Sequence, residues 1–499
     1  MYQSFIGLEV HIHLLTKTKG FCGCRSAFGD EPNTNVCPGC LGYPGVLPTV
    51  NREALRMGGM VARALNCSIP EKTWFERKQY FYPDMSKNYQ ITQFASPIGQ
   101  RGYVDIEGKI GGREIVKRVR IKECHLEEDA GKMIHTGTLS FLDYNRAGVS
   151  LLEIVTEPDM ETGEEAEIFI QQLRRTVRYL GVCDGNMEEG SLRADANVSI
   201  NFPGQGLGNK VEIKNLNSSR FVRLGLNYEI ARQGEMLDAG KTVTQETRLW
   251  NENRDETFPM RKKENAHDYR YYPDPDLPVI ETDAAFLKSV DDAMVELPLP
   301  RAKRLCAEYG LSGEQAELIC EEKAQADYFE EASALAAAAM GAPAGTGSPA
   351  ARDAAARTAN WLLQDIKRVM GREGVEPQKI GGLRLTPRRL AELVAMSAAG
   401  KVSVKNARQT LEAVMAEDRD PSDIIREKGW ELVSDPAKIA EAVRAVAAAE
   451  AETAAQAKAA DGKRRQTLTA YLVGRVIAAT GGRADPAAVK AQIEELLRA

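Results

Sequence analysis

The sequence has few histidines and no excess of basic residues. Of its 499 residues only 5 are His, and 65 Lys and Arg against 71 Asp and Glu give a formal net charge of −6. This balance excludes a uniformly basic nucleic-acid coat protein, and the 43% hydrophobic content excludes an intrinsically disordered chain. No apolar run approaches the ~18 residues of a membrane helix, and the start lacks a basic leader before an apolar core. We expect a cytoplasmic protein with no signal peptide and no membrane partner.

The sequence also lacks a glycine-rich loop that could hold a nucleotide. Gly240-Lys241-Thr242 resembles the end of a P-loop, but Glu235 occupies the position of the required glycine. The glycines between Gly204 and Gly208 do not have the dinucleotide spacing and favour a hairpin. A nucleotide here would have to be held by metal, lysines and a sheet.

Histidine and alanine are unevenly distributed along the chain. Alanine occurs 19 times in residues 1–320 and 44 times in residues 321–499, and alanine is the best helix former. This distribution places a helical accessory region in the second half and the chemistry in the first. All five histidines lie in the first 267 residues: His11, His13, His125, His135 and His267.

The first 293 residues predict an α+β domain with a large, mostly antiparallel sheet. Short alternating runs, such as Tyr103–Ile106 and Asn197–Ile200, are separated by Gly, Asn, Asp and Pro, as in strands and turns. Helical periods interrupt these runs, which makes the domain α+β. The predicted helices span 52–65, 164–180 and 220–233.

From residue 294 onward nearly every segment has helical periodicity. A break near Gly400 divides this part into an all-α helical domain, 294–400, and a small all-α tail domain, 401–499. The last stretch, 461–499, has seven Lys and Arg against four Asp and Glu and is locally basic. The predicted helices span 300–308, 314–339, 350–370, 386–399, 405–416 and 437–460.

Four of the nine cysteines form two close pairs. Cys22 and Cys24 are followed after twelve residues by Cys37 and Cys40, which flank a Pro-Gly turn. Two thiol pairs joined by a loop can form a tetrahedral thiolate site, for which Zn2+ is the usual metal. Two disulfides or an iron–sulfur cluster are the alternatives. A zinc site with four protein ligands would be structural, with no open position for catalysis.

The N-terminal strand carries titratable groups on one face. From Ile6 to Leu14 apolar and other residues alternate strictly, so Glu9, His11 and His13 share the face opposite the apolar residues. These groups form either a solvated edge or the wall of a site.

Further carboxylates occur in three short runs. His125 to Asp129 concentrates four titratable groups, and Leu151 to Val155 places Glu153 inside an otherwise apolar strand. A carboxylate in such a strand is costly unless it is paired or holds a cation, or unless it lies on the open face of an edge strand. A third acidic run ends at Asp195. Oxygen ligands with one imidazole suit Mg2+ or Mn2+, and hence phosphate chemistry.

The chain resembles the GatB family of the tRNA-dependent amidotransferases over essentially its whole length, and ten sequence blocks in residues 6–278 carry the resemblance. The resemblance is specific because so many blocks occur in one order. The blocks are IGLEVH (6–11), FERKQYFYPD (75–84), YQITQ (89–93), HLEEDAGK (125–132), DYNRAG (143–148), LLEIVTEPD (151–159), MEEGSLRADANVS (187–199), EIKNLNS (212–218), QETR (245–248) and DYRYYPDPDLP (268–278).

The resemblance implies a heterotrimer in which the GatB subunit is joined by the amidase subunit GatA and the small subunit GatC. Its substrates are Glu-tRNA(Gln) or Asp-tRNA(Asn), whose side-chain carboxylate is phosphorylated by ATP and then amidated by ammonia released from glutamine. A related two-subunit enzyme has a large inserted domain, for which this chain has no room. An alternative function is that of a zinc-ribbon RNA-binding scaffold without catalysis. That alternative gives no reason for the occurrence of His11, Glu127 and Glu153.

The resemblance also assigns roles to residues. His11, Glu127 and Glu153 match the family's Mg2+ ligands, in a catalytic cradle over residues 1–293 with a zinc loop at 22–40, and the tail domain contacts tRNA. The remaining candidates are Glu9, Lys78 and Glu128 for catalysis and Arg146 and Asp195 for contacts with ATP.

Overall fold

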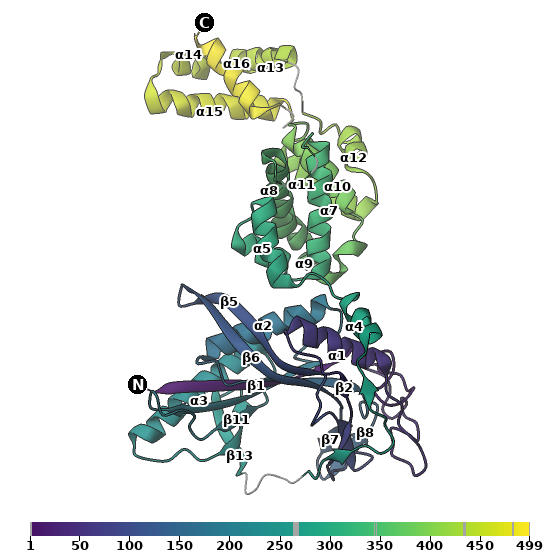
Figure 1. Cartoon of the computed structure of the whole chain (residues 1–499). Coiled ribbons are helices and arrows are strands. Elements are labelled where there is room, and N and C mark those ends of the chain that lie inside the picture. The colour runs from purple at the N-terminus through teal and green to yellow at the C-terminus, as the bar shows by residue number, and fades with distance from the viewer. Residues whose placement is uncertain are drawn as a thin grey trace. The chain divides into compact units, whose positions relative to one another are not determined.

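The computed structural model describes residues 2–262, 269–343, 345, 347–432, 436–481 and 484–498. The chain divides into two compact units, Met1–Leu297 and Pro298–Ala499. All strands in the described residues belong to the first unit, and the second unit is helical (Figure 1). The predicted α+β class, with the sheet before the helices, is confirmed. None of the described helices has the length and apolar character that a membrane crossing requires.

One large sheet forms the centre of the first unit. Its strands are β1 (Gln3–His13), β3 (Glu76–Gln79), β4 (Tyr89–Thr92), β5 (Gly99–Ile110), β6 (Arg113–Glu128), β9 (Ser150–Thr156), β10 (Leu192–Asn201), β11 (Val211–Lys214), β12 (Glu246–Asn251), β13 (Glu256–Lys262) and β14 (Tyr272–Pro273). Their order is β13-β12-β11-β10-β1-β9-β6-β4-β3-β14, with β5 paired to β6. Among the described strand pairs of this sheet, β11 with β12 is parallel and the others are antiparallel.

Three helices pack on the apolar face of this sheet. They are α1 (Arg52–Ala64), α2 (Gly163–Tyr179) and α3 (Ser219–Asp238), and they confirm the three helices predicted from periodicity. Helix α1 begins where the Asn51 side chain accepts hydrogen bonds from two backbone N–H groups of the first turn. Buried residues of these helices and of the sheet form one hydrophobic cluster.

Strand β1 lies between β10 and β9, and its alternation decides which face is polar. Leu8, Val10 and Ile12 are at most 1% exposed and belong to the hydrophobic cluster. Successive side chains of a strand point to opposite faces, so His11 and its neighbours at 9 and 13 lie on the other face. The helices cover the apolar face, and the polar face carries the candidate site.

Smaller elements complete the first unit. Strand β2 (Lys72–Thr73) pairs with β15 (Ile280–Glu281), and β7 (Lys132–Thr136) forms a hairpin with β8 (Leu139–Asp143). Helix α4 (Ala284–Asp291) is the last helix of this unit and packs on α1.

The second unit consists of helices joined by short loops. They are α5 (Pro298–Tyr309), α6 (Gly313–Ile319), α7 (Lys323–Ala339), α8 (Pro349–Asn360), the π-helical segment η1 (Trp361–Ile366), α9 (Lys367–Glu373), the 3-10 segment η2 (Pro377–Gly382), α10 (Pro387–Ala398), α11 (Val404–Glu417), α12 (Pro421–Glu427), α13 (Pro436–Ala449), α14 (Ala451–Ala459), α15 (Gly462–Ala479) and α16 (Pro486–Arg498). Apolar residues of α13 to α16 form a hydrophobic cluster of their own.

Two long helices predicted from helical periodicity, in alanine-rich segments, are each two helices in the structure. The run 314–339 is broken between α6 and α7, where the Gln325 side chain donates to the Leu318 carbonyl, 2.7 Å away, at the end of α6. The run 437–460 is broken at Glu450, whose ψ of 40° leaves the helical region and whose carboxylate accepts from Arg475 at 2.8 Å. Alanine favours helix on both sides of each break, so its content does not show where a helix ends.

Candidate functional site

A row of four side chains crosses the polar face of the sheet. His11 on β1 lies opposite Glu153 on β9 and opposite Arg193 on β10. Glu153 in turn lies opposite His125 on β6. Residues in register on adjacent strands have neighbouring side chains on the same face. The sheet therefore brings together residues that are more than 100 positions apart in the sequence.

Three side chains of this region converge closely enough to hold a metal ion. His11 Nε2 is 3.3 Å from Glu153 Oε2 and 3.6 Å from Glu127 Oε1. One ligand atom from each of the three residues lies within 4.8 Å of the other two. Two carboxylates and one imidazole form a donor set that suits a small divalent cation.

The electrostatics of the three residues favour an added positive charge. Burial lowers the pKa of His11, but the hydrogen bond and charge of Glu153, with the charge of Glu127, raise it to about 9. The pKa of Glu153 is lowered despite its burial, because His11 and His125 both contact it. Burial raises the pKa of Glu127, and the repulsion from Glu153 adds to this effect. A bound cation would relieve the cost of ionised Glu127.

His125 is a site residue to which the sequence patterns assigned no role. Its Nε2 is 3.2 Å from Glu153 Oε2 and 4.0 Å from Glu127 Oε2. Its Nδ1 is buried and has no hydrogen-bond partner among the described residues. The alternation of β6 was the available signal, because His125 and Glu127 are two residues apart and share a face.

A cleft of about 380 Å3 opens beside this row. Lys78 lines it, with Nζ 5.0 Å from the centroid of the Tyr269 ring. No described carboxylate lies within ion-pair distance of Lys78, so its charge is available to an anion in the cleft. The charged residues that line the cleft are His11, Lys78, Glu127, Asp129, Arg193, Asp195 and Lys214.

Asp129 holds three cationic or polar groups at one end of the cleft. Its Oδ2 is 2.8 Å from His13 Nε2, 2.9 Å from Arg193 Nη2 and 3.2 Å from Arg146 Nε. Burial would raise the pKa of Asp129, but the hydrogen bond from His13 and the charges of Arg193 and Arg146 lower it. Asp129 is therefore a buried carboxylate that the protein itself neutralises.

Arg193 lines the cleft with part of its guanidinium unpaired. Its protein contacts, with Asp129 and with His13 Nε2 at 3.3 Å, both use Nη2. Its Nε is buried and has no partner among the described residues. The sequence drew attention to the acidic run ending at Asp195, but Arg193, which shares the face of Asp195 on β10, was missed.

Arg146 lies outside this cleft lining. Its guanidinium donates to the carbonyls of Ala130, 3.0 Å from Nε, and Gly131, 2.9 Å from Nη2. Together with the contact to Asp129, these bonds make Arg146 an anchor for the turn that follows β6. Arg146 is not among the residues that line the cleft, although its guanidinium contacts Asp129, which is.

Glu9 and Asp195 lie opposite each other, one strand step from His11 and Arg193. Glu9 accepts a hydrogen bond of 3.0 Å from Asn197 Nδ2, and burial followed by the charge of Glu153 raises its pKa. Asp195 contacts Lys214 Nζ and lines the cleft. Both carboxylates therefore belong to the same polar face as the row.

Glu128 faces the opposite side of the sheet from Glu127. It is 1% exposed, pairs with Lys87 Nζ and accepts a hydrogen bond of 2.9 Å from the Ile91 amide. Adjacent residues of a strand point to opposite faces, and β6 ends at Glu128. The structure thus does not bring Glu128 to the cleft that Glu127 lines.

The four clustered cysteines lie together in the loop between β1 and α1. Their sulfur atoms are all within 4.8 Å of one another, and four thiolates around one Zn2+ lie ~3.8 Å apart. All nine cysteines are in described segments, and none forms a disulfide. A hydrogen bond from Cys22 lowers the pKa of Cys40, and the Cys37 amide and Lys19 act in the same direction. The donor set fits a tetrathiolate metal site.

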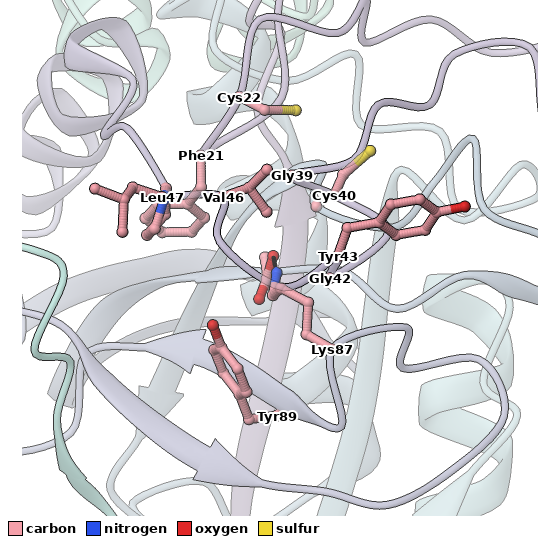
Figure 2. A pocket seen from close by; sticks show the side chains of 13 residues that line it. Phe21, Cys22, Gly39, Cys40, Gly42, Tyr43, Val46, Leu47, Lys87 and Tyr89 are labelled. Carbon is pink, nitrogen blue, oxygen red and sulfur yellow. Dashed lines mark hydrogen bonds and ion pairs between the residues drawn. The ribbon is translucent and has the colours of Figure 1, made fainter.

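A pocket of about 80 Å3 separates the cysteine loop from strand β4. Figure 2 shows Cys22 and Cys40 on one side of it and Lys87 and Tyr89 on the other. Glu128 also lines this pocket. Two consecutive carboxylates of β6 therefore line different cavities, Glu127 the cleft and Glu128 the pocket.

Of the two remaining histidines, the structure describes His135, which is not in the cleft lining. His135 lies on the β7–β8 hairpin, where its Nδ1 is 2.8 Å from Ser140 Oγ. His267 lies outside the described residues.

Two family models match the chain, each over one of its parts. The model described as "GatB/GatE catalytic domain" matches residues 4–288, and the model described as "GatB domain" matches residues 349–497. Curated relatives match over almost their whole length. Three of them are named as the B-type subunit of aspartyl/glutamyl-tRNA(Asn/Gln) amidotransferase.

The identities of these three relatives are similar. The protein of Carboxydothermus hydrogenoformans is 41% identical, with 99% of each chain covered. That of Crocosphaera subtropica is 42% identical, covering 99% of this chain and 98% of the relative. That of Thermodesulfovibrio yellowstonii is 41% identical, covering 100% of this chain and 99% of the relative.

The role of Asp129 is testable through stability. Asp129→Asn leaves two arginines beside a neutral amide, and we expect a loss of about 3 kcal/mol in the free energy of unfolding at pH 7. Because the folded-state pKa of Asp129 is lowered, its stabilisation is complete above a pH of about 4 and is lost as the pH falls toward the folded-state pKa. Urea unfolding at several pH values measures both effects.

The control is Asp105→Asn, which removes the exposed Arg118 ion pair. An exposed pair contributes up to about 1 kcal/mol, so this variant should remain close to the wild type. Equal stabilities of Asp129→Asn and the wild type at pH 7 would contradict the anchoring role.

Proposed function

The chain belongs to the GatB family of aspartyl/glutamyl-tRNA(Asn/Gln) amidotransferase subunits, and from this premise we propose how it acts. It is part of a carbon–nitrogen ligase that uses glutamine as the amido donor. Its substrates are Glu-tRNA(Gln) or Asp-tRNA(Asn), and its products are Gln-tRNA(Gln) or Asn-tRNA(Asn). The observation that carries this proposal is the convergence of His11, Glu127 and Glu153 beside a cleft that also contains Lys78 and Arg193.

The reaction has two steps. The side-chain carboxylate of the aminoacyl group attacks the γ-phosphorus of ATP, which gives an acyl phosphate and ADP. Ammonia then attacks the acyl carbon, inorganic phosphate leaves, and an amide remains. Activation is required because a carboxylate is a poor electrophile, whereas phosphate is a good leaving group.

The cleft residues have distinct roles in the first step. His11, Glu127 and Glu153 would hold Mg2+, which when bound neutralises charge on the transferring phosphoryl group. Lys78, with no carboxylate partner among the described residues, attracts the phosphates or the substrate carboxylate. Preorganised cations of this kind stabilise the transition state because they need no rearrangement during the reaction.

Arg193 takes the phosphate contact that the family resemblance suggested for Arg146. Arg193 lines the cleft next to His11, and only its Nη2 is used in protein contacts. The guanidinium of Arg146 is instead bonded to backbone carbonyls. Asp129 fixes Arg193, so the cation is in place before ATP binds.

Glu9 and Asp195 serve the same polar face. Asp195 lines the cleft, pairs with Lys214, and contacts hydroxyl or amino groups of ATP. Burial and the charge of Glu153 raise the pKa of Glu9, so a cation at the neighbouring metal ligands would favour the ionised form of Glu9. Both assignments extend the family resemblance to residues that the register places next to the metal ligands.

The chain works within a complex in the cytoplasm. The amidase subunit GatA supplies ammonia from glutamine, and the small subunit GatC completes the heterotrimer. The tail domain, 401–499, contacts the tRNA, and its locally basic end suits a phosphate backbone. Zn2+ at the four clustered cysteines stabilises the loop after β1 and takes no part in the chemistry.

The metal ligands are tested by Glu127→Gln and Glu153→Gln in the assembled amidotransferase. Loss of one oxygen ligand should lower the rate of tRNA-dependent ATP cleavage about 100-fold or more, since several kcal/mol of charge stabilisation are lost. Glu114→Gln, at an exposed position of β6, the strand that carries Glu127, should leave the rate of ATP cleavage unchanged. Wild-type ATP cleavage in either cleft variant would refute the phosphorylation role and favour an RNA-binding scaffold.

Arg193 is tested by chemical rescue. Arg193→Ala should lower kcat for ATP cleavage about 100-fold, as removal of one preorganised donor does elsewhere. Millimolar guanidinium ion should restore part of this activity, because it can occupy the space of the lost side chain. Arg146→Ala, which removes an anchor, should lose stability and show no rescue. An Arg193→Ala variant that retains its rate, or loses it without rescue, would contradict the phosphate contact.

Zinc is tested by metal analysis of the purified protein. We expect about one zinc per chain, and loss of that zinc in Cys24→Ser. Cys306→Ser, which alters a cysteine outside the cluster, should keep the zinc. An intact wild-type protein without zinc would exclude the structural zinc site.

A further inference from the structure

Lys19 is a fully buried lysine in the loop between β1 and α1. Its exposed fraction is 0%. Its Nζ is 3.1 Å from the Tyr144 carbonyl oxygen and 3.6 Å from Cys40 Sγ. No carboxylate of the described residues lies within ion-pair distance of it. A buried ammonium is strongly destabilising unless an opposite charge compensates it.

The surroundings leave Cys40 as the source of that opposite charge. Glu128, which lines the adjacent pocket, pairs with Lys87. Among the described residues, Lys19 is the only basic side chain in contact with a sulfur of the four clustered cysteines. Four thiolates and one Zn2+ have a net charge of −2, which a buried ammonium partly neutralises.

Lys19 is fixed by its backbone as well as by its side chain. Its amide donates to the Cys24 carbonyl at 2.9 Å, and the amide of Gly20 donates to the Gly148 carbonyl at 2.8 Å. The position of Lys19 is therefore tied to the cysteine loop on one side. On the other side it is tied to the turn 144–148.

The turn 144–148 connects this lysine to the cleft. It carries Arg146, which is held against Asp129. The amide of Gly148 donates to the Asp129 carbonyl at 2.9 Å, and Gly148 has a φ of +83°, a conformation that favours glycine. A displacement of the turn would thus reach Asp129, which lines the cleft.

We propose that Lys19 is the positioning residue that supplies the counter-charge of the cysteine metal centre and ties that centre to the turn 144–148. The inference rests on the proposed zinc site and extends it. Its ammonium stabilises the bound tetrathiolate through Cys40, and the same group donates to the Tyr144 carbonyl. Occupancy of the metal centre then determines how firmly the turn that carries Arg146 is held.

The competing interpretation is that Lys19 only fills space beside a neutral thiol. Lys19→Met distinguishes the space-filling role from the counter-charge role, because methionine has a similar length and no charge. Lys19→Gln keeps an N–H donor without the charge, and Lys19→Arg keeps the charge. Lys17→Met, at an exposed position two residues away, is the matched control.

The experiment measures zinc release from the purified full chain challenged with a chelator and a zinc-sensitive dye. We expect release at least 10-fold faster from Lys19→Met and Lys19→Gln than from the wild type. Lys19→Arg should lie nearer the wild type, and Lys17→Met should equal it. Equal release rates from the wild type, Lys19→Met and Lys19→Gln would overturn the counter-charge role.

Hydrogen exchange tests the tie to the turn without relying on a variant that must fold. Removal of zinc from the wild type should increase amide exchange in residues 144–148. Unchanged exchange there would overturn the tie. If the wild type binds zinc and the Lys19 variants release it at the wild-type rate, this inference alone is refuted. If the wild type binds no zinc, the zinc site is refuted as well.

Discussion

The register of β1 between β9 and β10 is the constraint on which the candidate site depends. It places His11 opposite Glu153 on one side and opposite Arg193 on the other. A slip of one residue would turn every side chain of β1 to the other face, so that Val10 would replace His11. The register is fixed by apolar side chains of the opposite face, which are buried against the helices. The hydrophobic core thus positions polar groups that it does not contact.

Asp129 and Glu127, two buried carboxylates of the polar face, have different charged groups around them. Asp129 is surrounded by His13, Arg193 and Arg146, and its pKa is lowered. Burial raises the pKa of Glu127 and the charge of Glu153 adds to this rise, although His11, His125 and Lys78 act in the opposite direction. The protein therefore compensates the charge of Asp129 with its own side chains, whereas our proposal gives the compensation of Glu127 to a bound cation.

Much of this arrangement was predictable from the sequence, and the limits have physical causes. The alternation of β1 showed which side chains share a face, and the spacing of Cys22 to Cys40 predicted that the four sulfurs meet. The partners of β1 lie about 140 to 200 residues away, and the alternation within one strand does not show which strands it pairs with. Arg193 was missed for that reason.

Family resemblance names candidate residues without saying which face of a strand each one lies on. It made Glu127 a candidate metal ligand and Glu128 a candidate catalytic residue, and alternation along β6 sends the two side chains to opposite faces. It also made Arg146 a candidate for contact with ATP, and the structure shows its guanidinium bonded to two backbone carbonyls. In the second unit, alanine-rich segments predicted helices correctly but hid their breaks, because the break near Glu450 depends on a tertiary contact with Arg475.

The end of β6 has a consequence for how this chain can vary. Glu127 lines the cleft, and Glu128 lines the pocket beside the cysteine loop, so a single strand forms the partition between two compartments. Substitutions along β6 change one compartment at a time. An insertion or deletion of one residue ahead of Glu127 would instead exchange the two carboxylates between compartments. Length changes in this segment must therefore occur in the loop at Gly111–Gly112, where β5 and β6 join and the two strands can lengthen together.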